Sequence, residues 1–186
     1  MELLLATRSA HKVQEIRTIL SGIPRLTVLD LDDIGLEWRD EEEALEPFDT
    51  FEENARSKAE YFHTRTGLPT VADDSGLEVD ALGGAPGVRS KRFAPVEGLT
   101  GHKLDQENNN YLVERLGALE LEKRTGQYVC VAALLGFASQ MIVTRGEARG
   151  LILTEPRGDG GFGYDPYFFE PDIDMTFAEH HPDQKN

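Results

Sequence analysis

The chain has 186 residues, of which 39% are hydrophobic, and it carries a formal net charge of -15. This length and apolar content suffice for one sizeable core, so disorder is not expected. The acidic balance, without a basic stripe interleaved with aromatic residues, excludes electrostatically driven binding to nucleic acid. The longest apolar run, residues 129–137, is far shorter than the roughly 20 residues of a membrane helix, and the N-terminus lacks a charged leader. The sequence therefore predicts a cytoplasmic protein that binds neither nucleic acid nor membranes.

The first part of the chain alternates short apolar runs with amphipathic ones. Residues 2–6 are predicted to form a buried strand, residues 9–20 a helix and residues 25–31 a second strand. Thr50 and Glu53 have the spacing of a capping box, which predicts a helix that begins there and ends near Arg65. This helix is expected to bury one side, formed by Phe51, Ala55, Ala59 and Phe62.

The second part is richer in β-type sequence. A strand is predicted over residues 68–72, a short extended piece over 77–82 and a helix over 104–116, and two β-type runs meet near residues 138–140 as in a hairpin. No linker or repeat divides the chain, so residues 1–186 are predicted to form a single α/β domain with a mixed sheet. Cys130, the single cysteine, lies in an apolar run and is predicted to be buried and inert.

The stretch TVADDSGLEVD, Thr70 to Asp80, places two adjacent aspartates after an apolar run. Asp-Ser-Gly is ordinary turn chemistry, which gives a purely structural interpretation. The functional interpretation starts from extended backbone, whose successive side chains point to opposite sides, so Asp73 and Asp74 cannot address one ligand in the same way. One of them is expected to fix the local backbone, and the other to hold a hard cation or accept a proton.

Residues 3–15, LLLATRSAHKVQE, predict a strand, a turn and the N-terminus of a helix, where an anion can bind. Thr7, Ser9 and Lys12 add hydroxyl groups and a cation there. The segment lacks the glycines of a Walker loop, so an ordinary serine N-cap is the simpler interpretation. On the capped helix, Asn54 and Lys58 lie four residues apart, and taken alone they predict a solvated face.

The glycine-rich segment GGFGYDP lies near the end of the chain. Glycines let the backbone approach a ligand closely, and Phe162 or Tyr164 offers a flat face for a base. A hairpin end is an equally good interpretation of this segment alone.

In combination and in this order, the motifs resemble those of the inosine triphosphate pyrophosphatases, which hydrolyse deaminated purine nucleoside triphosphates to the monophosphate and pyrophosphate. The similar segments, which span almost the whole chain, are LLLATRSAHKVQEI, TFEENARSKA, VADDSGLEVDALGGAPGVRSKRFA, NNNYLVERL, GFGYDPYFF and TFAEHHPDQKN. The resemblance implies an elongated mixed β-sheet whose helices form two lobes around a central nucleotide-binding cleft. It also implies a homodimer, Mg²⁺ as cofactor and ITP, dITP and XTP as substrates.

The resemblance assigns roles to individual residues. Asp74 is implied to be the catalytic carboxylate, which accepts a proton and associates with magnesium. Glu46 is implied to be a further metal ligand, with Glu43 as the alternative. The residues implied to bind substrate are Thr7, Ser9, Lys12 and Lys58 at the phosphates, Phe162 stacked on the base, and Ser75, Gly163, Tyr164, Asp165 and Lys185 at other positions.

Three departures from the family pattern are visible. Ser9 stands where the family has asparagine, the family's VYSARYAG reads VRSKRFAP, and the family continues past Asn186 into a Ser-His-Arg motif that reads the purine 6-oxo group. Base selectivity is therefore expected to be broader and weaker than in the family. Two rivals are considered: a Maf-like pyrophosphatase, which would lack the GGAPGV and GFGYDP segments, and a nucleotide-binding module that does not hydrolyse its ligand.

Overall fold

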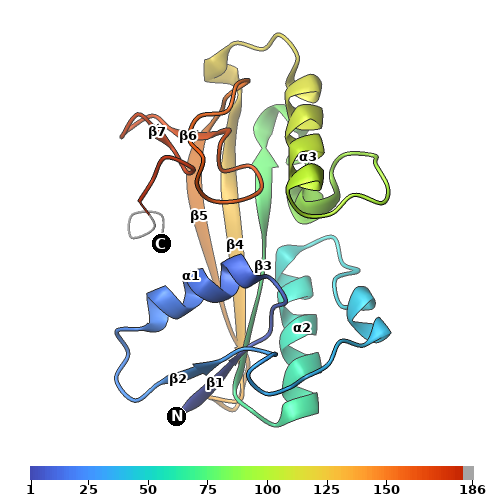
Figure 1. The fold of residues 1–186 in the computed structure, drawn as a ribbon, viewed down its shortest axis with the longest axis vertical. Coiled ribbons are helices and arrows are strands. Elements are labelled where there is room, and N and C mark those ends of the chain that lie inside the picture. The colour runs from blue at the N-terminus through green and yellow to red at the C-terminus, as the bar shows by residue number, and fades with distance from the viewer. Residues whose placement is uncertain (182–186) are drawn as a thin grey trace. The chain divides into compact units, whose positions relative to one another are not determined.

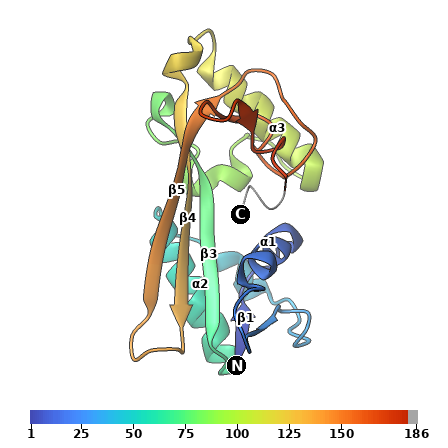
Figure 2. The ribbon, with the colours of Figure 1, turned by 90° about the vertical axis from the view of Figure 1, so that its left-hand side faces the viewer.

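The structure, a computed structural model, describes residues 1–181, and within them one mixed sheet runs in the order β2-β1-β3-β4-β5-β6-β7 (Figures 1 and 2). The α-helices are α1 (Ala10–Leu20), α2 (Phe51–Thr66) and α3 (Gly101–Leu116). The strands are β1 (Glu2–Leu5), β2 (Thr27–Leu29), β3 (Thr70–Val79), β4 (Thr125–Leu135), β5 (Ile142–Ile152), β6 (Phe168–Glu170) and β7 (Met175–Thr176). Short 3₁₀ helices are η1 (Asp40–Ala44), η2 (Asp80–Leu82), η3 (Gly87–Arg92) and η4 (Leu121–Lys123). The predicted mixed α/β class is confirmed.

The chain divides into two compact units. Among the described residues, the first comprises Met1–Asp74 and Cys130–Gly146, and the second comprises Ser75–Val129 and residues 147–181. Strands β3, β4 and β5 each contribute residues to both units. Among the described residues, none of the helices combines the length and the apolar character needed to cross a membrane.

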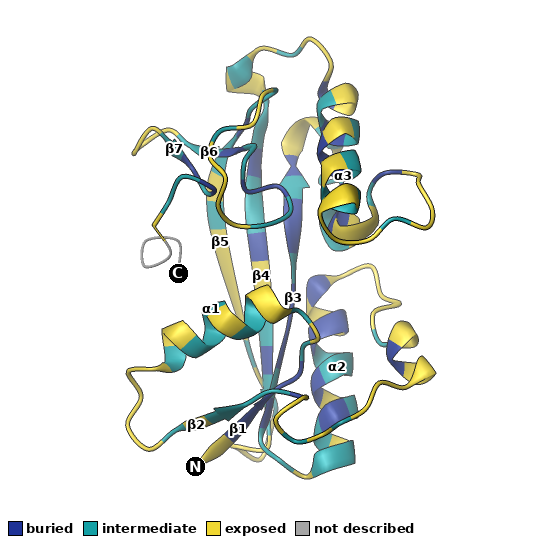
Figure 3. Ribbon diagram, in the orientation of Figure 1, coloured by how far each residue is buried: buried dark blue, intermediate teal, exposed yellow. Residues whose placement is uncertain are grey.

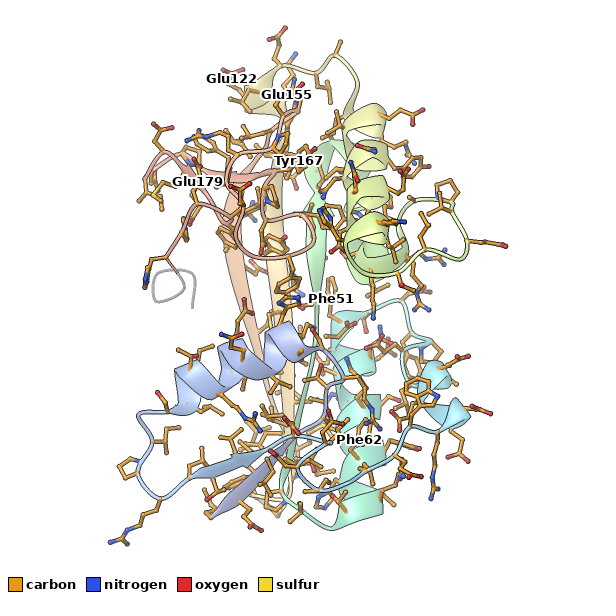
Figure 4. The ribbon with its side chains drawn as sticks, in the orientation of Figure 1. Phe51, Phe62, Glu122, Glu155, Tyr167 and Glu179 are labelled. Carbon is orange, nitrogen blue, oxygen red and sulfur yellow. The ribbon has the colours of Figure 1, made fainter. Side chains whose placement is uncertain are left out.

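In the first unit, β1 lies parallel to both β2 and β3, and Leu4 and Leu5 of β1 are completely buried. Helices α1 and α2 flank this part of β3 (Figure 1). Helix α2 buries the predicted side, including Phe51 and Phe62, which Figure 4 labels. Helix α1 contains no fully buried residue, so its apolar face is only half covered (Figure 3).

Thr50 is the N-cap of α2, at the start that the capping-box spacing predicts. The hydroxyl oxygen of Thr50 accepts a hydrogen bond from the Glu53 amide at 3.2 Å, and the hydroxyl donates to the Glu53 carboxylate at 2.6 Å. At the other end, Gly67 takes a left-handed conformation with φ 71° and closes the helix. Local sequence therefore sets both ends of α2.

Of the two interpretations of Asp-Ser-Gly, the turn is excluded, because β3 continues through these residues without a break. Gly76 is required by close packing. A Cβ atom there would lie 2.3 Å from Oγ of Ser90 and 2.6 Å from the carbonyl oxygen of Gly87. The Ser90 hydroxyl joins these segments, since it accepts from the Leu77 amide at 2.8 Å and donates to the Gly87 carbonyl at 2.7 Å. Asp73 and Asp74 consequently lie inside a strand.

The prediction of a buried Cys130 is also wrong, because its side chain is exposed. Its neighbours along β4, Val129 and Val131, are both buried. Side chains alternate between the two faces of a strand, so the apolar run is covered on one face only at this point. Partial removal of the thiol from water and the negative charge of Asp73 raise its pKa to about 11, which favours the unreactive thiol form over the thiolate.

The second unit has its own core. Residues from β3, α3, β5, β6 and the loop before β6 meet in it, namely Leu77, Val79, Leu112, Leu116, Ile152, Tyr164 and Phe168. Strand β6 pairs antiparallel with β5 and β7, and β4 neighbours β5, as the predicted hairpin requires. The glycine-rich loop is thereby joined to the core through Tyr164 and Phe168.

Candidate active site

Two buried carboxylates occupy the middle of β3 in the first unit. Asp73 is 7% exposed and Asp74 is 8% exposed. Nζ of Lys12, on α1, lies 2.5 Å from the Asp73 carboxylate, whereas Nδ2 of Asn54, on α2, donates to Asp74 at 3.0 Å. The two carboxylates therefore have different partners on different helices, as expected for successive residues of a strand.

Lys58 contacts both the segment that carries Glu46 and the strand that carries Asp74. From α2, its ammonium group forms short contacts with the Glu46 carboxylate and with the backbone carbonyl of Asp73. Its charge also acts on Asp74. Glu46 is thus placed beside the cation and carboxylates of this unit, which supports it over Glu43 as a ligand candidate.

The environment of Asp74 changes its affinity for protons. Burial raises the pKa of Asp74, and the charge of Glu46 adds to this effect. Lys58, the Asn54 hydrogen bond and Lys12 lower it, but the pKa remains above the ordinary aspartate value. Asp74 is therefore a better proton acceptor than an exposed aspartate, a property found at catalytic sites.

Lys12 remains charged although it is half-buried. Burial lowers the pKa of Lys12, but the adjacent Asp73 more than offsets this, so that the pKa lies above its ordinary value. The site thus contains two lysines on separate helices, and both point their ammonium groups at β3 oxygen atoms.

The carboxylates of Asp74 and Glu46 fit a magnesium ion whose remaining coordination positions are filled by water and by the phosphates of a substrate. Within the described part of the chain, no three His, Cys, Asp or Glu side chains gather into a metal-binding group. Asp74 and Glu46 are close enough for the charge of one to act on the other. Magnesium commonly takes only one or two protein carboxylates and fills its remaining positions with water and phosphate oxygens.

The segment before α1 has the geometry of a helix N-terminus. Ser9 is the N-cap and accepts from the Lys12 amide at 3.5 Å, and Oγ1 of Thr7 accepts from the Ser9 amide at 3.2 Å. The simpler interpretation of Ser9 as an N-cap is therefore confirmed. The same arrangement leaves Thr7 and Ser9 at the positive end of the helix dipole, where phosphate binds well.

In the second unit, the loop GFGYDP is held by buried side chains. Asp165 is 2% exposed, and its carboxylate accepts from the Phe162 amide at 2.8 Å and from the Tyr128 hydroxyl at 3.0 Å. Burial raises the pKa of Tyr128 well above its ordinary value, so the hydroxyl stays protonated and remains a donor. This geometry makes Asp165 the residue that shapes the loop.

The other predicted residues of this loop differ in exposure. Tyr164 is buried in the core and donates to the Ser90 carbonyl at 2.8 Å, so its ring is not a free stacking surface. The carbonyl of Gly163 accepts from Asn109 at 2.9 Å. Phe162 is half-buried, and it is the aromatic residue of GFGY that keeps an accessible face. Ser75, in the same unit, is also half-buried.

The predicted residues of the first unit are Thr7, Ser9, Lys12, Glu46, Lys58 and Asp74, and those of the second are Ser75 and residues 162–165. Lys185 lies outside the described residues. The prediction that Asn54 lies on a solvated face is wrong, since it is 1% exposed and bonded to Asp74. Glu42, also buried, was not singled out by the sequence. For Asn54 the available signal was its position three residues after Phe51, on the buried side of α2.

Comparisons with known proteins place this chain in a family. A model of the Ham1 family matches residues 3–186. A dITP/XTP pyrophosphatase of Thermus thermophilus is 44% identical over 179 residues, which cover 96% of this chain and 81% of the relative. One from Geobacter sulfurreducens is 43% identical over 184 residues, covering 99% and 87%.

Solved structures of similar sequence share the fold of this chain. A Ham1 protein from Coxiella burnetii matches with a TM-score of 0.83 and 34% identity, and the match covers all of this chain and 90% of that one. A nucleoside-triphosphatase, also described as dITP/XTP pyrophosphatase, from Mycobacterium abscessus matches with a TM-score of 0.75 and 35% identity, covering 100% and 91%.

Proposed function

The chain belongs to the Ham1 family, and we propose that it hydrolyses the triphosphates of deaminated purines, ITP, dITP and XTP, to the nucleoside monophosphate and pyrophosphate. The observation that carries this proposal is Asp74, a buried carboxylate with a raised pKa beside Lys58. Hydrolysis of a phosphoanhydride needs a group that accepts a proton and cations that offset phosphate charge. Both are present in the first unit.

In the proposed reaction, Asp74 takes a proton from a water molecule while the water oxygen attacks the α-phosphorus. A new P–O bond forms there, the bond from the α-phosphorus to the α,β-bridging oxygen breaks, and pyrophosphate leaves with that electron pair. Lys12 and Lys58 offset the charge of the triphosphate, and the helix terminus at Thr7 and Ser9 supplies hydrogen-bond donors. The phosphates compete with Asp73 and Glu46 for the two lysines.

The hydrolysis is proposed to depend on Mg²⁺, which Asp74 and Glu46 would hold. When bound, the ion offsets the charge of the phosphate oxygens and of the departing pyrophosphate. In the second unit, Phe162 is proposed to stack on the base, while Asp165 and Tyr164 keep the loop in shape. Substrate contacts by Ser75, Gly163 and Lys185 remain part of the proposal. So do the single domain, the homodimer and the cytoplasmic location.

Pyrophosphate release from ITP, dITP, XTP, GTP and ATP, with and without Mg²⁺, tests this function. We expect pyrophosphate and the monophosphate as products from the deaminated purines, and no turnover once EDTA removes the metal. Release of inorganic phosphate would indicate cleavage at the γ-phosphate and contradict the proposal. Binding of ITP without any product would identify the chain as a nucleotide-binding module.

A further inference from the structure

Asn54 of α2 makes three hydrogen bonds that join separate parts of the first unit. Its Nδ2 donates to the carboxylate of Asp74 at 3.0 Å and to the carbonyl of Phe48 at 3.2 Å, while its Oδ1 accepts from the amide of Phe48 at 3.0 Å. The side chain is 1% exposed. The Asn54 amide donates to Asp74, and it both donates to and accepts from the backbone of Phe48. These three bonds fix the orientation of the amide group.

These bonds connect Asp74 with the chain that follows Glu46. Phe48 stands two residues after Glu46, so holding the backbone of Phe48 limits where the Glu46 carboxylate can lie. The bond to Asp74 fixes the orientation of that carboxylate on β3. Lys58, one turn further along α2, contacts Glu46 from the same helix. Helix α2 thereby contacts Asp74 through Asn54 and Glu46 through Lys58.

We infer that Asn54 is a positioning residue, which holds Asp74 and the chain after Glu46 in the relative arrangement that binds a divalent cation. This inference rests on the proposed function for its link to catalysis, but its effect on metal binding can be measured without a substrate. Side chains that orient metal ligands typically change metal affinity or activity by about 10- to 100-fold when they are replaced.

Asn108 of α3 provides a matched comparison for a purely structural role. It is 2% exposed and also makes three hydrogen bonds, accepting from the amides of Phe93 and Ala94 at 3.0 and 2.9 Å and donating to the carbonyl of Lys91 at 3.1 Å. All of its bonds go to backbone groups. Replacing Asn108 therefore removes the same number of buried hydrogen bonds without removing one to a carboxylate.

The experiment compares Asn54→Leu and Asn54→Ser with Asn108→Leu in the full chain. Leucine has the same branched shape as asparagine but removes all three hydrogen bonds. Serine, a smaller polar side chain, is the variant to measure if Asn54→Leu does not fold. Mn²⁺ binding to the protein alone is measured by electron paramagnetic resonance, thermal unfolding reports stability, and kcat and KM are measured with dITP.

We expect the Asn54 variants to bind Mn²⁺ about tenfold more weakly and to lose about 10- to 100-fold in kcat, with KM within about threefold of the wild type. Asn108→Leu should lower the unfolding temperature and leave Mn²⁺ affinity unchanged. Wild-type Mn²⁺ affinity in a folded Asn54 variant, or an equal loss in Asn108→Leu, would overturn the inference. If the wild-type chain releases no pyrophosphate, the proposed function fails, whereas the Mn²⁺ comparison still decides the role of Asn54.

Discussion

The buried carboxylate of Glu42 gives a quantitative prediction about the loop that leads to Glu46. Glu42, on η1, has a side chain only 3% exposed. It accepts from Nε and Nη2 of Arg8, both at 3.0 Å, and from Nη1 of Arg65 at 3.3 Å. Arg8 stands between Thr7 and Ser9, so this cluster ties the η1 loop to the candidate phosphate-binding segment.

Glu42→Gln should destabilise the first unit by about 3 kcal/mol. Each charged hydrogen bond contributes about 1.5–3 kcal/mol, and glutamine keeps one acceptor oxygen while its amide group faces guanidinium donors. Breaking a buried ion pair costs about 3–5 kcal/mol, and the partial exposure of Arg8 and Arg65 reduces this cost. Glu41→Gln, an exposed neighbour on η1, is the control and should change stability by less than about 0.5 kcal/mol.

Urea unfolding followed by tryptophan fluorescence measures this effect locally. Trp38 is the single tryptophan of the chain and lies two residues after Leu36, whose carbonyl accepts from Arg8 at 2.9 Å. The urea concentration at the midpoint of the fluorescence transition should fall for Glu42→Gln and remain at the wild-type value for Glu41→Gln. Equal midpoints for the two variants would mean that Glu42 and its arginines do not hold this loop.

Two further predictions concern β3 and β4. Gly76→Ala should destabilise the second unit by about 2–4 kcal/mol, because the added methyl group displaces the Ser90 hydroxyl from its two hydrogen bonds. A urea denaturation midpoint equal to that of the wild type would contradict this close approach of Gly76 to Ser90. Cys130, whose pKa is about 11, should react slowly with iodoacetamide at pH 8, and its rate should rise about tenfold per pH unit up to pH 10, since only the thiolate reacts and a raised pKa keeps the thiol protonated. A rate that levels off near pH 9 would show an ordinary thiol.

The sequence predicted those features that depend on neighbouring residues. Thr50 and Glu53 marked the start of α2 because a capping box lies within four residues, and the buried positions from Phe51 to Phe62 followed from helical periodicity. The assignment of Asp73 and Asp74 to different partners followed from the alternation of a strand.

The features that were missed depend on residues far apart in the chain. One of the two interpretations of Asp-Ser-Gly placed Gly76 in a turn, whereas its role is set by Ser90, fourteen residues further on. Asn54 was placed on a solvated face because its partner Asp74 comes twenty residues later. Glu42 looked like one of several loop acids, and only the folded chain brings Arg8 and Arg65 to it.

A comparison of Asp74→Asn with Asp73→Asn in the hydrolysis of dITP decides whether Asp74 accepts the proton in pyrophosphate release. The two substitutions are chemically identical and affect adjacent residues of β3 that bond to different helices. Loss of a general base costs about 10²- to 10⁴-fold, so Asp74→Asn should lower kcat by at least about 100-fold. Asp73→Asn should act mainly on KM through Lys12. Normal turnover by Asp74→Asn would mean that Asp74 is not the group that accepts the proton.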